Sequence, residues 1–293
     1  MSESLAVARA VNRAAPDPRR TLQLALAALW LFDGILQYQP SMFTRAFPQM
    51  LGDSAQGNPS VVAGPITWSA GLIDHHLALL NAVFATIQVA LGLGIAWRPT
   101  VRVALAASVA WSLAVWWLGE GLGGVLAGTA SLIDGAPGAV ILYAVLAVLL
   151  WPADWEAGKG LARALWLAVW GSMAVLAVLP AARAPHALSD AISDMAPGEP
   201  KWLAWLDTHV ASALYRHGPA ASIVLAAVFT ALAAGVFLPV RHLRPVLVLA
   251  LAVAVVLWLA QGLGGIFTGM STDPNSGPLL ALLALSFWPG RVS

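Results

Sequence analysis

Two acidic residues next to long apolar stretches are the positions in this sequence best suited to chemistry. Asp33 lies within the apolar stretch 22–38, and Glu120 directly follows the apolar stretch 101–119. A carboxylate among apolar residues is costly to desolvate, which favours an inward-facing position and a role in proton transfer. We therefore take Asp33 and Glu120 as candidate catalytic residues.

Histidines and a further acid are expected at the same level as these two residues. Asp74, His75 and His76 precede the apolar stretch 77–97, and His217 precedes a later one. Imidazole and carboxylate groups are ligands of metals such as Cu(II) and Zn. These four residues are candidate metal ligands. His76 and His217, which lie at equivalent starts of apolar stretches, are also a candidate pair for binding a haem or a metal.

Hydrogen-bonding residues for an organic cofactor are also present. Gln37 lies four residues after Asp33, on the same face of a helix. Together with Trp117 and Gln261 it is a candidate residue for binding a cofactor such as a quinone. Spacing alone does not distinguish a quinone site, a proton relay and a metal site from a purely structural role, in which Asp33 is neutral or hydrogen-bonded and Asp74 caps a helix.

The composition predicts that these residues belong to an all-α, polytopic membrane protein. Hydrophobic residues make up 59% of the 293-residue chain and charged residues 10%, whereas soluble domains contain about 25% charged residues. The longer apolar stretches match the about 20 residues that a membrane-spanning helix needs, and their continuous apolar character favours helices. The eight predicted spans are 22–38, 77–97, 101–119, 136–151, 164–182, 219–238, 243–260 and 278–288.

The positive charges predict the orientation in the membrane. Eleven of the 15 Lys and Arg residues fall on one side of the predicted spans, and the other four are Arg45, Arg183, Lys201 and Arg216. The richer side is expected to be cytoplasmic, which places both termini in the cytoplasm and the chain in a bacterial inner membrane. The basic residues do not cluster as a nucleic-acid-binding face would require. Because cysteine is absent, thiol redox chemistry and Cys-ligated metals are excluded, and redox activity would need a bound cofactor.

An internal repeat divides the chain into two units. The segment WWLGEGLGGVLAG at Trp116–Gly128 matches LWLAQGLGGIFTG at Leu257–Gly269, 141 residues later, and the same shift pairs Pro137 with Pro278. Because each unit has four spans, the two units are expected to be parallel, related by an axis along the membrane normal. The predicted parts are a cytoplasmic tail at 1–21, unit 1 at 22–151, a linker at 152–163 and unit 2 at 164–289.

The two units differ in their ionisable residues. Met173 replaces Asp33 in unit 2, and Gln261 replaces Glu120. We therefore expect the site to lie within unit 1, near the outer face. The Gly-rich segment before each short fourth span is expected to form a broken or re-entrant turn, with a tilted span as the alternative. The Trp-rich segment at 202–206 predicts an amphipathic helix on the outer surface, which is also suited to docking a periplasmic partner.

Unit 1 resembles a known family. Its first span reads LWLFDGILQYQPSMF, and its second and third spans are joined by NAVFATIQVALGLGIAWRPTVRVAL, with a short Arg-bearing turn between them. This pattern is similar to that of the DoxX/DoxD-like family of four-helix membrane proteins, and residues 164–289 resemble it more weakly. The resemblance implies a tandem duplication of that unit. It also implies a link to quinones, because some members are described as subunits of thiosulfate:quinone oxidoreductase.

Three functions follow from these patterns. The first is a quinone- or redox-linked membrane subunit with a polar site in the outer leaflet of unit 1. The second is a non-catalytic structural or assembly subunit of a larger membrane complex, and the third is a transporter or metal-handling protein. The expected partners are the lipid bilayer and membrane or periplasmic subunits, and the expected cofactor is a quinone or a divalent metal. The sequence does not decide whether the protein is an enzyme.

Overall fold

The computed structural model describes residues 17–152 and 158–289, and every regular element within them is helical. Most of the predicted tail and the centre of the predicted linker, residues 1–16 and 153–157, lie outside the described residues. Five helical segments are long and apolar enough to cross a membrane, which is compatible with an integral membrane protein. They are Leu77–Ala96, Arg98–Leu118, Lys159–Ala177, Gly218–Gly235 and Val240–Ala260.

The two halves of the described chain contain the same succession of α-helices. In the first half these are α2 (Pro18–Gln37), α3 (Ala46–Asp53), α4 (Ser60–His75), α5 (Leu77–Ala96), α6 (Val101–Leu118) and α7 (Ala139–Leu149). In the second half they are α8 (Lys159–Ala177), α9 (Ala187–Ser193), α10 (Lys201–Leu214), α11 (Gly218–Gly235), α12 (Val240–Ala260) and α13 (Ser276–Ser286).

Three of the eight predicted spans correspond to helices outside the group of five. Helix α2 has 20 residues but carries Arg19, Arg20 and Asp33. Helices α7 and α13 have 11 residues each, so each is about 16 Å long, at about 1.5 Å per residue. That length covers roughly half of the about 30 Å hydrocarbon core of a bilayer. The eight-span arrangement therefore depends on the segments that precede α7 and α13.

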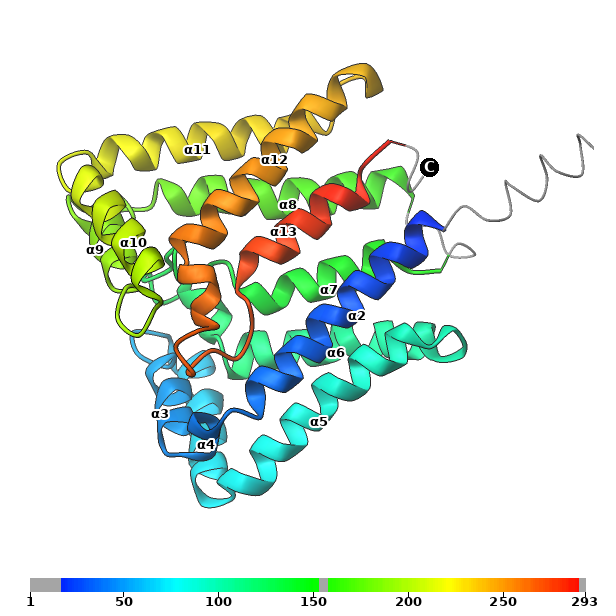
Figure 1. Cartoon of the computed structure of the whole chain (residues 1–293), viewed down its shortest axis with the longest axis vertical. Helices are drawn as coiled ribbons and strands as arrows, with labels where there is room; N and C mark the ends of the chain where they lie inside the picture. Colours follow the sequence, from blue (N-terminus) through cyan, green and yellow to red (C-terminus); the bar gives the residue numbers. More distant parts are fainter. Residues whose placement is uncertain (1–16, 153–157, 290–293) are drawn as a thin grey trace, which may run out of the picture.

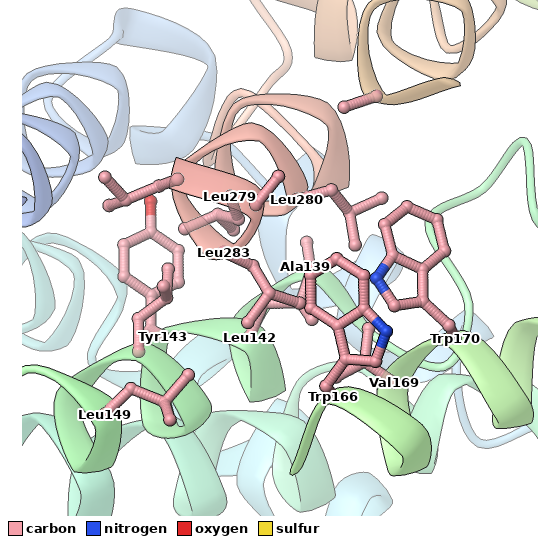
Figure 2. Packing of buried hydrophobic residues seen from close by; sticks show 14 of the residues in the cluster. Ala139, Leu142, Tyr143, Leu149, Trp166, Val169, Trp170, Leu279, Leu280 and Leu283 are labelled. Carbon is pink, nitrogen blue, oxygen red and sulfur yellow. The ribbon is translucent and has the colours of Figure 1, made fainter. Parts of the chain in front are cut away.

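Helices α7 and α13, which correspond to the fourth predicted span of each unit, lie at the centre of the bundle, with longer helices around them (Figure 1). Helix α13 packs against α7 and α2, and α7 packs against α8, so the two halves meet through their fourth and first helices. Leucines of α13 face Leu142 and Tyr143 of α7 and the indole rings of α8 (Figure 2). Helices α2 and α5 approach closely because Gly92 has no side chain: a Cβ there would lie 2.8 Å from the carbonyl oxygen of Ala27.

The start of α2 is fixed by local capping and by contacts with other helices. The Asp17 carboxylate accepts a hydrogen bond from the backbone N–H of Arg19, and Pro18 occupies the first turn. The Arg19 side chain donates to the carbonyl oxygen of Trp151 at 3.0 Å, and Arg20 donates to that of Ile95 at 2.9 Å. These guanidinium groups thus satisfy carbonyls near the ends of α7 and α5, where a positive charge is favourable.

Helices α3, α4, α9 and α10, which connect the first and second predicted spans of each unit, lie together at one end of the bundle (Figure 1). The start of α2 and the end of α13 lie at the opposite end, as does the turn between α5 and α6. The described chain therefore begins and ends on the side that carries the short Arg-bearing turns.

The two Gly-rich segments adopt the same unusual backbone. The turns η3 (Gly121–Gly124) and η4 (Gly262–Gly265) each contain a leucine with positive φ, Leu122 at 56° and Leu263 at 53°. A Cβ on Gly123 would clash with the backbone of Pro137, and one on Gly264 would clash with the backbone of Pro274. Pro274 is thus the structural counterpart of Pro137. The predicted pairing of Pro137 with Pro278 is wrong, because the connection after the second turn is shorter.

Candidate ligand chamber

A pocket of about 950 Å³, partly open to the surface, lies at the end of the bundle that carries α3, α4, α9 and α10, and we call it the chamber. It is lined by residues of α2, α5, α6 and α7 and by both Gly-rich segments. Its volume lies within the about 300–1,000 Å³ of typical small-molecule sites. The polar or titratable residues of its wall include Asp33, Gln37, Gln88, Trp111, Glu120, Tyr143, Gln261 and Asp273.

The two candidate catalytic residues both line the chamber. Asp33 is 2% exposed, and its Oδ1 atom has no hydrogen-bond partner among the described residues. Glu120 follows the end of α6, and its Oε1 atom accepts from the backbone N–H of Val140 at 3.1 Å, in the first turn of α7. A carboxylate at a helix N-terminus is stabilised by the free N–H groups there. The second oxygen of Glu120, Oε2, has no partner among the described residues.

Three further residues of unit 1 complete this polar wall, and the sequence interpretation missed them. They are Gln88 on α5, Trp111 on α6 and Tyr143 on α7. Gln88 Oε1 and Trp111 Nε1 have no hydrogen-bond partner among the described residues, and the Tyr143 hydroxyl lies beside the Asp33 carboxyl. For Gln88, a polar side chain within the apolar stretch 77–97 was the available signal.

Unit 2 also contributes to the chamber. The Gln261 side chain donates from Nε2 to the carbonyl oxygen of Leu132 at 2.9 Å and to the hydroxyl of Ser276 at 2.8 Å. Asp273, in the segment between η4 and α13, is a second lining residue from this unit. The chamber is therefore lined by both units, whereas the sequence predicted a site within unit 1.

The lining of the chamber is acidic. It includes the carboxyl groups of Asp33, Asp53, Glu120, Asp134 and Asp273, and no Lys, Arg or His among the described residues. Without a nearby positive charge, a buried carboxyl group requires a hydrogen-bond donor or a proton. The arrangement is thus suited to accept hydrogen bonds or protons from a bound molecule.

The predicted cofactor-binding residues differ in their positions. Gln37 lines the chamber, but its side-chain amide pairs with that of Asn81, which also donates to the Gln37 carbonyl oxygen at 3.0 Å. Gln37 thereby joins α2 to α5. Trp117 is 44% exposed and is not part of the chamber wall, whereas its neighbour Trp116 donates to the carbonyl oxygen of Pro137 at 2.7 Å.

The predicted metal ligands lie outside the chamber. Asp74, His75, His76 and His217 are all exposed, and Asp74 pairs with Arg45 at 3.7 Å. His76 and His217 occupy equivalent positions at the starts of α5 and α11. The described residues contain no group of three or more His, Asp or Glu side chains placed to hold a metal ion. The metal and haem hypotheses thus gain no support from the described part of the chain.

Apolar side chains occupy the corresponding positions in unit 2. Met173 and Phe229, the sequence counterparts of Asp33 and Gln88, are 1% and 0% exposed. The ring of Phe229 lies 6.0 Å from that of Trp170, in the hydrophobic core. The two units therefore share a backbone pattern but differ in the polarity of their interiors.

A separate acidic pair lies beside the second Gly-rich turn. Glu199 precedes α10 and lies beside Asp207, which is buried on that helix. Burial, with smaller contributions from the neighbouring Asp207 carboxyl group, raises the pKa of Glu199 to about 8. At neutral pH the pair therefore holds a proton.

No protein-family model, no curated protein and no solved structure matches this chain. The resemblance to the DoxX/DoxD-like family stays a hypothesis based on the two quoted segments of unit 1. The structural basis for a function is an acidic chamber lined by both units of a helical chain compatible with the membrane.

Proposed function

We propose that this chain is a redox-linked subunit of the bacterial inner membrane that binds a quinol in the chamber. In this proposal it crosses the membrane eight times, as two parallel four-helix units with both termini in the cytoplasm. Helices α7 and α13 span the inner half of the bilayer, and the Gly-rich segments extend through the outer half. Irregular backbone is tolerated at that depth when it is buried in protein or lines a cavity, and these segments line the chamber.

One observation carries the ligand assignment: hydrogen-bond acceptors without partners predominate in the chamber. Asp33 Oδ1, Gln88 Oε1, Glu120 Oε2 and Gln261 Oε1 are buried and unpaired among the described residues. Leaving such groups unsatisfied costs about 1–3 kcal/mol each. A quinol donates two hydrogen bonds from opposite ends of a flat ring, so it matches a wall that is rich in acceptors.

Aromatic side chains support the same ligand class. Trp30 and Tyr143 both line the chamber, with ring centroids 4.2 Å apart, and Trp111 forms another part of the wall. Such side chains pack well against a flat ring. The resemblance to a family with quinone-linked members is consistent with this choice.

The two acids then have defined roles. Asp33 and Glu120 accept hydrogen bonds from the bound quinol. When a redox partner withdraws its two electrons, these carboxylates take up the two protons. The requirement for a redox partner agrees with a subunit of a larger membrane complex.

The test is binding of a quinol to the purified protein in lipid nanodiscs, followed by quenching of tryptophan fluorescence. We expect saturable binding of decylubiquinol, and we expect Asp33→Asn to weaken it about tenfold, as loss of one charge-assisted hydrogen bond does. The thermal stability of the variant should be retained. Asp190→Asn, in the exposed part of α9, is the matched control and should bind as the unmodified protein does.

Two results contradict this proposal. Absence of saturable quinol binding removes the quinol site. If Asp33→Asn also leaves the composition and activity of the native complex unchanged, the structural or assembly role becomes the preferred function.

Binding or transport of a small organic cation is the second candidate, because the chamber is acidic and lacks a basic residue among those described. Carboxylates and aromatic faces together bind such cations. Saturable quenching by tetraethylammonium, with no response to the quinol, would favour this function.

A further inference from the structure

The loop between η4 and α13 brings a carboxyl group of unit 2 to the acids of unit 1. Asp273 lines the chamber, and its charge interacts with both Asp33 and Glu120. Its position is fixed within its own loop. Asp273 Oδ1 accepts from the backbone N–H of Asn275 at 2.7 Å, and Oδ2 accepts from the Thr272 hydroxyl at 3.1 Å.

These two bonds make Asp273 an acceptor in the chamber. Both of its oxygens already receive a hydrogen from the protein, which favours the ionised form relative to a buried carboxyl group without such donors, and each keeps a lone pair for another donor. Asp33 and Glu120 differ, because each has an oxygen without a partner among the described residues and can carry a proton. A protonated carboxyl donates to a quinone oxygen as readily as a carboxylate accepts from a quinol. Asp273 alone of the three therefore discriminates between the two forms.

Unit 1 shows what replaces this carboxyl group in the equivalent segment. Because Pro137 and Pro274 contact the equivalent glycines, the residue before each proline is equivalent, and unit 1 has Ala136 where unit 2 has Asp273. Ala136 is 4% exposed. Unit 1 thus has an uncharged side chain at the position equivalent to Asp273.

We infer that Asp273 is a specificity-determining residue that makes the chamber prefer the reduced quinol to the oxidised quinone. The second unit then sets the selectivity of a site whose proton-accepting acids come from the first. This inference rests on the proposed quinol function. It adds that the fixed carboxyl group repels the acceptor oxygens of a quinone and receives the hydroxyl hydrogens of a quinol.

The experiment measures equilibrium binding of decylubiquinol and decylubiquinone to the full-length protein in nanodiscs under anaerobic conditions. We expect the unmodified protein to bind the reduced form about tenfold more tightly, the ratio that one hydrogen bond supplies. In Asp273→Asn the ratio should fall below about threefold, mainly through tighter binding of the quinone. Asp194→Asn removes an exposed carboxylate outside the chamber and should keep the original ratio.

The outcomes separate this inference from the proposed function. If neither form binds, the quinol function itself fails. If both forms bind equally to the unmodified protein, or if its preference persists in Asp273→Asn, the inference about Asp273 alone is overturned. Should Asp273→Asn fail to fold, Asp273→Ala, which copies the residue of unit 1, gives the same comparison, and an unchanged preference in it also overturns the inference.

Discussion

Filling the chamber should stabilise the protein and abolish ligand binding at the same time. Gln88 projects an amide oxygen without a partner among the described residues into the chamber, and unit 2 has the buried Phe229 at the corresponding position. The substitution Gln88→Phe therefore copies the interior of unit 2 into unit 1. Because Gln88 lines the open space of the chamber, we expect the phenylalanine ring to fit.

The size of the effect follows from the environment of Gln88, which is 9% exposed. Removing a buried polar group that lacks a partner stabilises a protein by about 1–3 kcal/mol. For a chain of this size each kcal/mol raises the melting temperature by about 2–4 °C. We therefore expect an apparent Tm about 2–12 °C higher for Gln88→Phe.

Thermal unfolding in nanodiscs and the quinol-binding assay together test this prediction. Thr86→Phe is the matched control, because Thr86 is exposed on the same helix and is not part of the chamber wall. This control should keep quinol binding. A lower Tm for Gln88→Phe combined with unchanged quinol affinity would refute the chamber as a ligand site.

Two further predictions concern the membrane topology and the acidic pair of Glu199 and Asp207. Reporter fusions after Arg20, Lys159 and Arg291 should be cytoplasmic, and fusions within 50–65 or 190–205 should be external; one reversed reporter breaks the eight-span arrangement. For Glu199, burial raises the pKa from 4.5 to about 8, so the folded protein binds the proton more tightly than the unfolded chain within that range. Its contribution to stability is therefore present at pH 4.5 and is lost as the pH rises toward 8. Scanning calorimetry should show that Tm falls more between pH 5 and pH 8 in the unmodified protein than in Glu199→Gln. An equal fall in both proteins would contradict the assignment of a bound proton to Glu199.

Local sequence patterns were sufficient for the helical class and for the first two residues of the chamber. Continuous apolar stretches require helices because lipid cannot satisfy backbone groups, and the described helices follow those stretches. Asp33 and Glu120 were identified because a carboxyl group next to apolar residues is costly unless it faces the protein interior. Both line the chamber.

Long-range packing decided the rest of the site. Asp273 lies in a loop of unit 2, and only the contact between the second Gly-rich turn and Pro274 brings it to acids more than 150 residues away in sequence. Trp117 and Trp116 are adjacent and chemically identical, so sequence could not tell which one reaches Pro137. The direction in which each indole ring points depends on the backbone at the end of α6. The sequence by itself determined a membrane-type helical chain with acids in its interior. The tertiary structure decided that both units line one chamber, because the lining depends on where the two Gly-rich turns pack.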